Sequence, residues 1–325
     1  MQGKITKIFS LTLLTCGSLL FAEEEEGHWD LLTDFVYMER YHVKNQTLAV
    51  TSPRNTKGKT SSLSVKDLAT GFGFEPGLQA TLSYIQDPRS SYEAGFVYVW
   101  DWENTKTRKS DTSSLSFPFK DSSFTRDFFE VAEIQAYYRS QFYTAELNYA
   151  KAFSESRDSY LSLSGVGGFR FASLKEKFSL KASESKKFAE MDIKTSNDLI
   201  GLQLGFAFQI NAVKSFHWDL DGKVGVGLNR ISANSFLSDQ NNTVQLRNFS
   251  KLDWQTNIFA VASAGFGYRA LSCLDIHAGY EMLYFCGLAL APDQIDKSSR
   301  TSGFHVHHDG YVIVHGFYMG FLFSF

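Results

Sequence analysis

Residues 311–325, YVIVHGFYMGFLFSF, close the chain and decide its fold. Counting by twos divides them into a large and a small face. The large face carries Ile313, Phe317, Met319, Phe321, Phe323 and Phe325. The small face carries Val314, Gly316, Gly320 and Ser324. Period two is typical of a β-strand, because successive side chains point to opposite faces. A membrane helix is disfavoured, because it needs about eighteen consecutive apolar residues.

A final strand with alternate aromatic residues and a terminal Phe resembles the last strand of bacterial outer-membrane barrels. In those proteins the assembly machinery reads this strand, so the resemblance implies that machinery as a partner of residues 311–325. The alternative is a buried edge strand of a soluble protein, which three alternating Phe residues fit poorly. We expect residues 311–325 to pair with the first strand, near residues 29–41, and to turn their large face to outer-membrane lipid.

Composition points to the same class of protein. The chain has 325 residues, with 30 Phe, 15 Tyr, only 5 Pro and a net charge of −3. Its mean hydropathy of −0.20 is low for a helical membrane protein. It suits a barrel, in which every second residue faces water or the lumen. No basic patch or phosphate-binding glycine loop occurs, so we expect neither nucleic-acid binding nor a cofactor.

The N-terminus reads as a secretory signal peptide over residues 1–22. Lys4 and Lys7 precede the apolar residues 8–21, and Ala22 stands before four consecutive Glu residues. A lipoprotein anchor at Cys16 is the alternative, but Thr15 is a poor residue before a lipidated Cys. We therefore expect residues 23–325 to form a single outer-membrane barrel domain.

Alternating segments fill the rest of the chain, most clearly at residues 200–210 and 216–229. Ten segments are clear, and residues 65–74 and 176–189 would raise the number to twelve. The prediction is an all-β fold, a transmembrane antiparallel up-and-down β-barrel of about 12 strands, within a range of 10–14. A soluble sandwich is the alternative. Its strands would be shorter and would lack Tyr and Trp at the segment ends.

Long polar segments separate these strands on one side. Residues 44–66, 104–126 and 231–251 are rich in polar side chains, whereas connections such as residues 139–142 and 211–215 are short. Outer-membrane barrels have long extracellular loops and short periplasmic turns. We therefore predict that the three polar segments are extracellular loops.

The motifs resemble a family of bacterial outer-membrane proteins named "putative beta-barrel porin seven". The strongest match is GYE at residues 279–281, followed by GLALAPDQ at residues 287–294. Weaker matches bring the similarity to roughly residues 70–325. The resemblance implies an outer-membrane barrel, suggests a pore and brings no catalytic residues.

Charged residues on the polar strand faces are the candidate lumen-lining residues. They are Glu93, Glu133, Arg139, Glu146, Arg170, His217, Asp219, Asp221, Lys223, Arg269, Asp275 and Glu281. Opposed charges in a narrow barrel can line a polar channel or plug it with ion pairs. The first interpretation is a porin-like protein that passes small polar solutes or ions. The second is a structural or surface-exposed, adhesin-like barrel without an open pore.

Two constellations raise other possibilities. His217, Asp219 and Asp221 share one strand face and suggest an outer-membrane hydrolase, but no Ser or Cys nucleophile stands in a recognisable context. We therefore expect no enzymatic activity. The run His305, His307, His308 and Asp309 could bind zinc, but solvated histidines at a barrel rim are the preferred interpretation, so no metal site is predicted.

Only Cys273 and Cys286 remain after signal cleavage. Thirteen residues of strand would separate them by roughly 40 Å, too far for a disulfide. Disulfide-linked neighbours and a homo-oligomer therefore stay open as partners.

Overall fold

The structure is a computed structural model of the chain. It describes residues 27–41, 43–51, 60–112, 114–119, 126–153, 160–184, 187–213, 215–239, 244–297 and 305–325. The predicted signal peptide, residues 1–22, lies outside the described residues.

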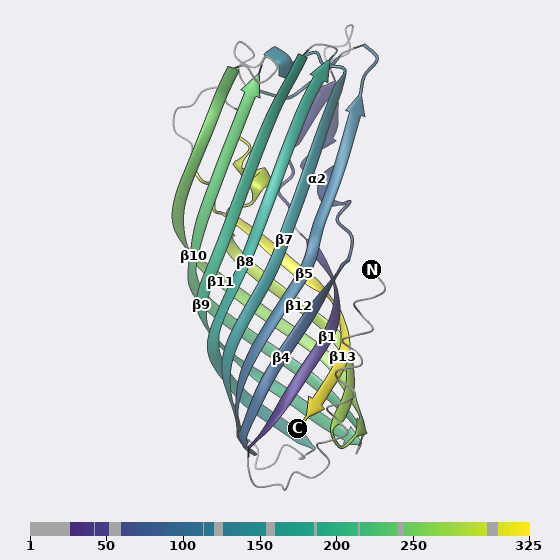
Figure 1. Cartoon of the computed structure of the whole chain (residues 1–325), viewed down its shortest axis with the longest axis vertical. Coiled ribbons are helices and arrows are strands. Elements are labelled where there is room, and N and C mark those ends of the chain that lie inside the picture. Colours follow the sequence, from purple (N-terminus) through teal and green to yellow (C-terminus); the bar gives the residue numbers. More distant parts are fainter. Residues whose placement is uncertain are drawn as a thin grey trace.

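Ten antiparallel strands form a closed barrel (Figure 1). They are β1 (His28–Tyr41), β4 (Glu75–Asp87), β5 (Ser90–Lys109), β7 (Glu133–Ala152), β8 (Leu161–Glu184), β9 (Lys187–Val213), β10 (Phe216–Asp239), β11 (Val244–Leu271), β12 (Leu274–Leu288) and β13 (Gly310–Ser324). Strand β13 pairs with β1 from Asp30 opposite Ser324 to Tyr41 opposite Ile313, which confirms the predicted closing pair. Because β13 also pairs with β12, neither edge of this strand is free.

The barrel has ten strands, not the predicted twelve. Residues 65–74 do not form a strand: α2 (Val65–Ala69) begins there, with a capping box between Ser64 and Asp67. Residues 176–189 do not add a strand either, because they extend β8 and open β9. The predicted polar loop at 231–251 is in large part strand, within β10 and β11. Of the predicted loop at 104–126, only residues 104–109 belong to β5, and Leu115–Ser116 form the short strand β6. The chain therefore makes fewer and longer strands, up to the 28 residues of β11.

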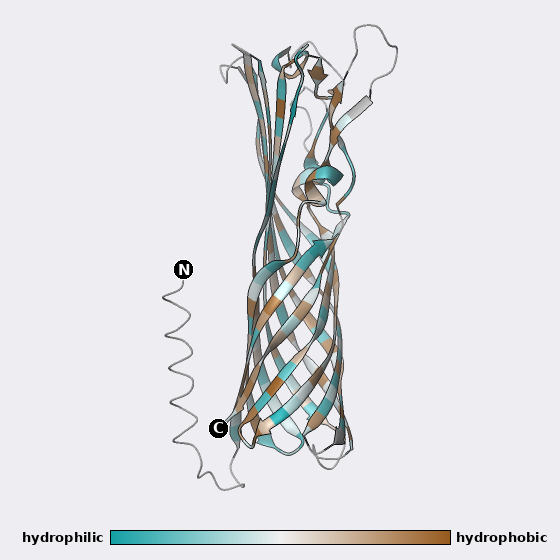
Figure 2. Cartoon of the chain, turned by 90° about the vertical axis from the view of Figure 1, so that its right-hand side faces the viewer, coloured by the Kyte–Doolittle hydropathy of each residue, from teal (hydrophilic) through white to brown (hydrophobic). Residues whose placement is uncertain are grey.

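The polarity of the barrel wall inverts along its length. Near the short turns, here named the turn end, the outer face is apolar: Phe169 and Leu204 are 58% and 70% exposed. Further along the same strands, the outer face carries Lys177 and Lys194, and the inner face becomes apolar. Figure 2 shows how hydrophilic and hydrophobic residues alternate along the strands. An apolar outer face suits lipid and a charged one suits water, so the inversion marks the limit of the membrane band. Strands β5 and β7 to β11 continue beyond it to what we name the extended end.

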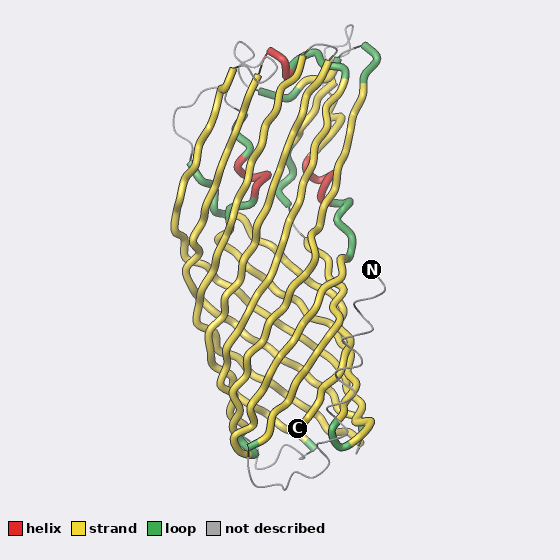
Figure 3. Tube along the Cα trace, viewed as in Figure 1, coloured by secondary structure: helices red, strands yellow, loops and turns green. Residues whose placement is uncertain are grey.

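A compact cap fills the inside of the extended end. It comprises the sheet of β3 (Thr60–Ser64), β2 (Thr47–Thr51) and β6 (Leu115–Ser116), helix α2, and the single turns η1 (Arg126–Phe128) and η2 (Ala291–Gln294), with their connections. Figure 3 shows two of the short helical pieces inside the extended walls. Within the described residues, no helix is long and apolar enough to cross a membrane.

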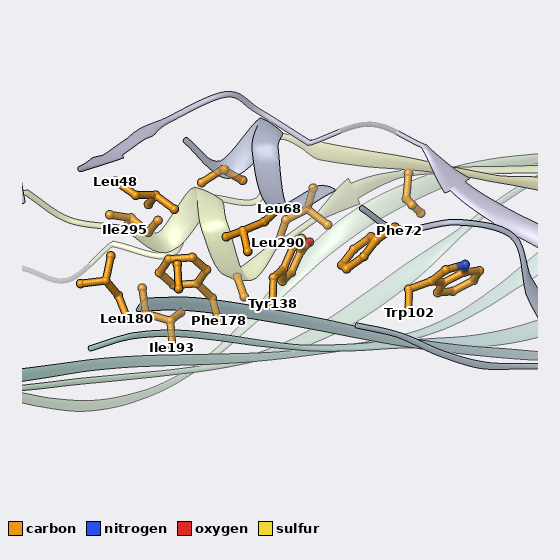
Figure 4. Close-up of a cluster of buried hydrophobic side chains, with 14 of the residues drawn as sticks. Leu48, Leu68, Phe72, Trp102, Tyr138, Phe178, Leu180, Ile193, Leu290 and Ile295 are labelled. Atoms are coloured by element: carbon orange, nitrogen blue, oxygen red, sulfur yellow. The ribbon is translucent and has the colours of Figure 1, made fainter. Parts of the chain in front are cut away.

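Apolar side chains hold the cap against the wall. Leu48, Leu68 and Leu290 of the cap are fully buried, as are Phe178 and Ile193 of strands β8 and β9. Figure 4 shows the two sets facing each other. Each such side chain gains roughly 1.5–3 kcal/mol from burial. The cap and the wall therefore share a buried apolar core.

The lipid-facing assignment predicts a large effect at Leu204, in the middle of the apolar band. Leu204→Arg should lower the free energy of unfolding in lipid vesicles by about 2–4 kcal/mol, because it places a charge in the hydrocarbon. Ser196→Arg, on the same face of β9 but beyond the band, is the matched control and should change it by less than about 0.5 kcal/mol. Equal effects of the two variants would contradict the assignment of Leu204 to the middle of the membrane band.

Candidate functional site

The barrel interior is divided into three tiers, which follow one another along each strand from the turn end. The first is polar and is here named the chamber. The second is an apolar layer. The third is a polar seam that holds the cap. On β12, for example, Glu281 lies in the chamber and Phe285 in the apolar layer, and on β8 Glu176 lies in the seam.

Glu146 is the centre of the part of the chamber that lies nearer the apolar layer. Its carboxylate is ion-paired with Arg170 and accepts a hydrogen bond of 2.8 Å from Lys223 Nζ. Gln203 Nε2 donates to Glu146 at 2.8 Å, and Gln203 Oε1 accepts from Arg170 Nε at 2.9 Å. The side chains of Glu146 and Lys223 are still 16% and 14% exposed although they face inward. Water-sized space therefore remains beside this network.

The chamber contains more carboxylates towards the turn end. Asp34 on β1 reaches across β13 to His277 on β12, with 2.5 Å between Oδ1 and Nε2. Gly320 of β13 lies between them, and a Cβ there would come within 2.4 Å of Asp34 Oδ1. Gly279 likewise makes room for Tyr318: a Cβ at Gly279 would be 2.3 Å from the Tyr318 hydroxyl. Inward glycines thus make room for large polar side chains on neighbouring strands.

The structure places most of the predicted lumen-lining residues on the inner face of the barrel. These are Glu93, Glu146, Arg170, His217, Asp219, Asp221, Lys223, Asp275 and Glu281. His217 Nε2 lies 3.4 Å from Asp219, and Ser263 donates to Asp221 at 3.2 Å. Arg269 lies at the turn-end rim, 3.7 Å from Asp275.

Glu133 and Arg139 are placed differently from the prediction. Both lie on the outer face of β7, beyond the apolar band, because the neighbouring Ile134 and Tyr138 are buried under the cap. Glu133 pairs with Lys109 at 3.2 Å, and Arg139 pairs with Asp101. On this part of β7 polar residues face outward, the reverse of the pattern in the band.

The apolar layer crosses the lumen between the chamber and the seam. Its inward side chains are almost fully buried: Val36, Met38, Val97, Val99, Phe142, Phe259, Val261, Leu283, Phe285 and Val314. Phe285 lies 5.6 Å from Phe142 and 5.9 Å from Phe259 between ring centroids. Among the described residues, this layer contributes no charged side chain to the lumen.

A buried ion pair forms the centre of the seam. Arg40 Nη2 lies 2.5 Å from Glu176 Oε1, and both side chains are fully buried. Tyr138 donates to the same oxygen at 2.8 Å, and the Ala291 amide donates to Glu176 Oε2 at 2.8 Å. The Arg40 guanidinium also lies over the Tyr138 ring, 5.5 Å from its centroid. One carboxylate therefore joins β1, β7, β8 and the η2 turn of the cap.

Asparagine side chains of the wall hold the chain that leads into η2. Gly287, with φ of +70°, lies at an irregularity in the β12–β13 pairing, where the chain turns inward. Asn229 donates to the Gly287 carbonyl at 2.8 Å. Asn197 bonds Ala289 twice, accepting from its amide at 2.8 Å and donating to its carbonyl at 3.0 Å. The GLALAPDQ motif is thus the segment that enters the barrel and closes the extended end.

Removing this attachment should loosen the cap. Asn197→Ala leaves the buried Ala289 amide and carbonyl without partners, so we expect the free energy of unfolding to fall by about 1–3 kcal/mol. Denaturant titration in detergent micelles measures the change. Asn234→Ala, on the exposed outer face of β10, is the control and should have no measurable effect. If Asn234→Ala lowered the free energy of unfolding as much as Asn197→Ala, this role of Asn197 would be contradicted.

The cap also contains an acid with an altered pKa. Burial, with Glu176 nearby, raises the pKa of Asp293 to about 6. The folded cap therefore favours protonated Asp293. Asp293 contributes its full stabilisation of the folded state below about pH 4, which is the pKa of this carboxyl in the unfolded chain. The contribution is lost as the pH rises through about 6, the pKa in the folded protein. We expect wild type to lose stability relative to Asp293→Asn between pH 4 and pH 7, measured by urea titration. A difference that is independent of pH would contradict this.

The apolar layer and the seam were not among the features predicted from the sequence. The signal for the layer was present: FVYVW at residues 96–100 and MLYFC at 282–286 are apolar at every position, which is typical of strands buried on both faces. No sequence signal could have paired Arg40 with Glu176, which are 136 residues apart.

The remaining candidates are not brought together in the described part of the chain. No three His, Cys, Asp or Glu side chains there are grouped so that they could hold a metal ion, and this includes residues 305–309. Cys273 and Cys286 are both free thiols.

Comparison with solved structures places the fold. The outer membrane protease OmpT of Escherichia coli has a TM-score of 0.50 at 9% identity, over 94% of this chain and 99% of that one. The translocator domain of the autotransporter NalP from Neisseria meningitidis has a TM-score of 0.37 at 8% identity, over 98% and 95%. The toluene transporter TodX of P. putida has a TM-score of 0.30 at 10% identity, over 93% and 90%. The likeness to OmpT shows an outer-membrane-type β-barrel.

Comparison with curated proteins gave no match. The family described as "Putative beta barrel porin-7 (BBP7)" matches residues 102–308, which is more than half of the chain. These residues include Tyr138 and Glu176 of the seam, the asparagine attachments and the GLALAPDQ segment, whereas Arg40 lies outside the match. The chain therefore belongs to this beta barrel porin-7 family.

Proposed function

We propose that the protein is a closed barrel of the bacterial outer membrane, which presents its extended end to the cell exterior and has no permanently open pore. The apolar layer is the observation that carries this proposal. A polar solute in the chamber would have to pass Phe142, Phe259 and Phe285 and then the packed cap. Apolar constrictions exclude ions because the ions would lose their hydration shells.

Planar-bilayer recording of the refolded protein tests the proposal. We expect wild type to show no steady conductance. The positive control combines Phe142→Ser, Phe259→Ser and Phe285→Ser with replacement of the cap segments 43–72, 112–131 and 289–309 by short Gly-Ser linkers, and it should conduct. Steady ohmic conductance of wild type would overturn the closed-barrel proposal.

A gated pore is the second candidate. The polar chamber favours it, because Glu146 and Lys223 keep water-accessible surface inside the membrane band. A structural barrel needs no such space, whereas a channel for small polar solutes or ions does. Passage would require the cap and the apolar layer to move. Brief, full-size openings of wild type in the same recordings would favour this function over a permanently closed barrel.

We propose no enzymatic activity. His217 and Asp219 are paired with each other, and Asp221 accepts from Ser263, so these groups have partners inside the lumen. The alternative of a hydrolase is tested by assaying lipase and protease activity of the refolded protein. Activity that His217→Ala abolishes would establish a hydrolase and overturn this part of the proposal.

The C-terminal strand fits recognition by the assembly machinery only before the barrel closes. In the folded barrel, β13 is bonded to β1 and to β12, so its backbone is not available to a partner. We propose that the machinery reads residues 311–325 in the unfolded precursor. Deleting Phe325 should then reduce the yield of assembled protein in cells and leave the stability of refolded protein nearly unchanged.

A further inference from the structure

Basic side chains gather on the outer wall just beyond the membrane band. Arg139, Lys177 and Lys194 lie directly opposite one another on the neighbouring strands β7, β8 and β9. Neighbouring strands are about 4.8 Å apart, so this row spans roughly 10 Å. Lys175 lies one outward position nearer the band on β8. We name these four residues the basic patch.

Two members of the basic patch have a carboxylate partner. Arg139 is paired with Asp101, and Lys177 Nζ lies 3.9 Å from Asp192. The side chains of Arg139 and Lys177 are nevertheless 46% and 42% exposed, so both keep donors that face solvent. These two residues are compensated in charge and still accessible to a ligand.

The other two members have no carboxylate partner within the described chain. Lys175 and Lys194 are both exposed, and neither forms an ion pair there. Asp198, in the row next to the band, faces Arg230 across the β9–β10 pair. Like charges directly opposite each other destabilise a strand pair, and Lys194 faces Lys177. A bound anion would remove this repulsion.

The basic patch lies at the level of lipid headgroups. Phe171 and Ile200, opposite each other on β8 and β9, mark the limit of the apolar band on these strands. Lys175 is four residues beyond Phe171, about 13 Å along the strand. Its Nζ lies 6.0 Å from the ring centroid of Tyr143, so this side chain bends back towards the band. The Tyr143 ring in turn lies 5.9 Å from the Phe171 ring. Apolar surface therefore begins directly beneath the basic patch.

We propose that the basic patch binds the phosphorylated sugar headgroup of an outer-leaflet lipid whose acyl chains lie along the apolar band. Lysine ammonium groups are suitable donors to phosphate oxygens. Gln141 and Ser196 lie on either side of Lys175 in the same row, and their neutral side chains suit sugar hydroxyls. A soluble anion would gain nothing from the apolar band. The proposed direction of the barrel names the leaflet.

Native mass spectrometry of the refolded protein in neutral detergent, titrated with lipid A at constant ionic strength, tests the proposal. We expect saturable binding of lipid A. Lys175→Gln combined with Lys194→Gln should weaken it about 25-fold, because each lysine near a charged lipid surface contributes about fivefold.

The matched control removes the same charge further from the band. Lys109 and Lys181 lie on the outer wall near the extended end, paired with Glu133 and Glu190. Lys109→Gln combined with Lys181→Gln should bind lipid A as wild type does. If the basic-patch double variant does not fold, Lys194→Gln alone carries the test, with an expected loss of about fivefold.

Three further probes identify what is recognised. Monophosphoryl lipid A, with one phosphate fewer, and phosphatidylglycerol, which has no sugar, should bind more weakly than lipid A. Inorganic phosphate should show no saturable binding. The proposal is overturned by no saturable binding of lipid A to wild type, by equal affinity for phosphatidylglycerol, by saturable binding of inorganic phosphate, or by unchanged affinity in the basic-patch variants. No conductance is measured, so the outcome is independent of whether the barrel is closed.

Discussion

Glu176→Ala should lower the free energy of unfolding by about 3–5 kcal/mol, the loss expected when one partner of a buried ion pair is removed. Arg40 would keep a fully buried guanidinium with no carboxylate beside it. Tyr138 and the Ala291 amide would lose their acceptor as well. Guanidinium titration of the refolded protein, followed by tryptophan fluorescence, measures the change.

Two further variants isolate the cause. Glu190→Ala removes a half-buried outer carboxylate, 3.6 Å from Lys181, and it should lower the free energy of unfolding by less than about 1 kcal/mol. Removing both charges with Arg40→Met and Glu176→Leu should cost clearly less than Glu176→Ala alone, because no buried charge is left unpaired. If the double variant is as unstable as Glu176→Ala, an unpaired buried charge is not the cause of the loss of stability.

Phe285→Ala should lower the free energy of unfolding by a similar amount, about 3–5 kcal/mol. The Phe285 side chain is almost fully buried in the apolar layer and contacts two other rings, so its removal leaves a cavity between Phe142 and Phe259. Denaturant titration in micelles is again the measurement. The lipid-facing Phe169→Ala should cost clearly less, because lipid tails can fill the space that its ring leaves. Similar losses for the two variants would argue against a packed layer in the lumen.

The seam explains why the effect of Glu176→Ala is coupled to the cap. Glu176 accepts the Ala291 amide, and Asn197 and Asn229 hold the chain that leads to it. Loss of these attachments should release residues 287–294 before the barrel strands separate. The strands have a continuous hydrogen-bond ladder, whereas the cap depends on a few side chains.

Alternation was enough to predict the closed antiparallel barrel, the pairing of β13 with β1 and the outward direction of Phe317 and Met319. Period two fixes which side chains share a face, and a lipid-facing side must be apolar. The strand number was overestimated for a different reason: residues 65–74 begin with a helix, and residues 176–189 only lengthen β8 and β9. Beyond the membrane band the polarity inverts, so long strands with charged outer faces read as polar loops.

The sequence by itself determined the fold class, the closing strand and most of the residues that face inward, because these follow from local periodicity. Only the tertiary structure decided what fills the interior. The pairing of Arg40 with Glu176 and the packing of the rings of Phe142, Phe259 and Phe285 depend on which strands lie opposite across the lumen. Those distances are set by strand number, tilt and register, which no single segment encodes.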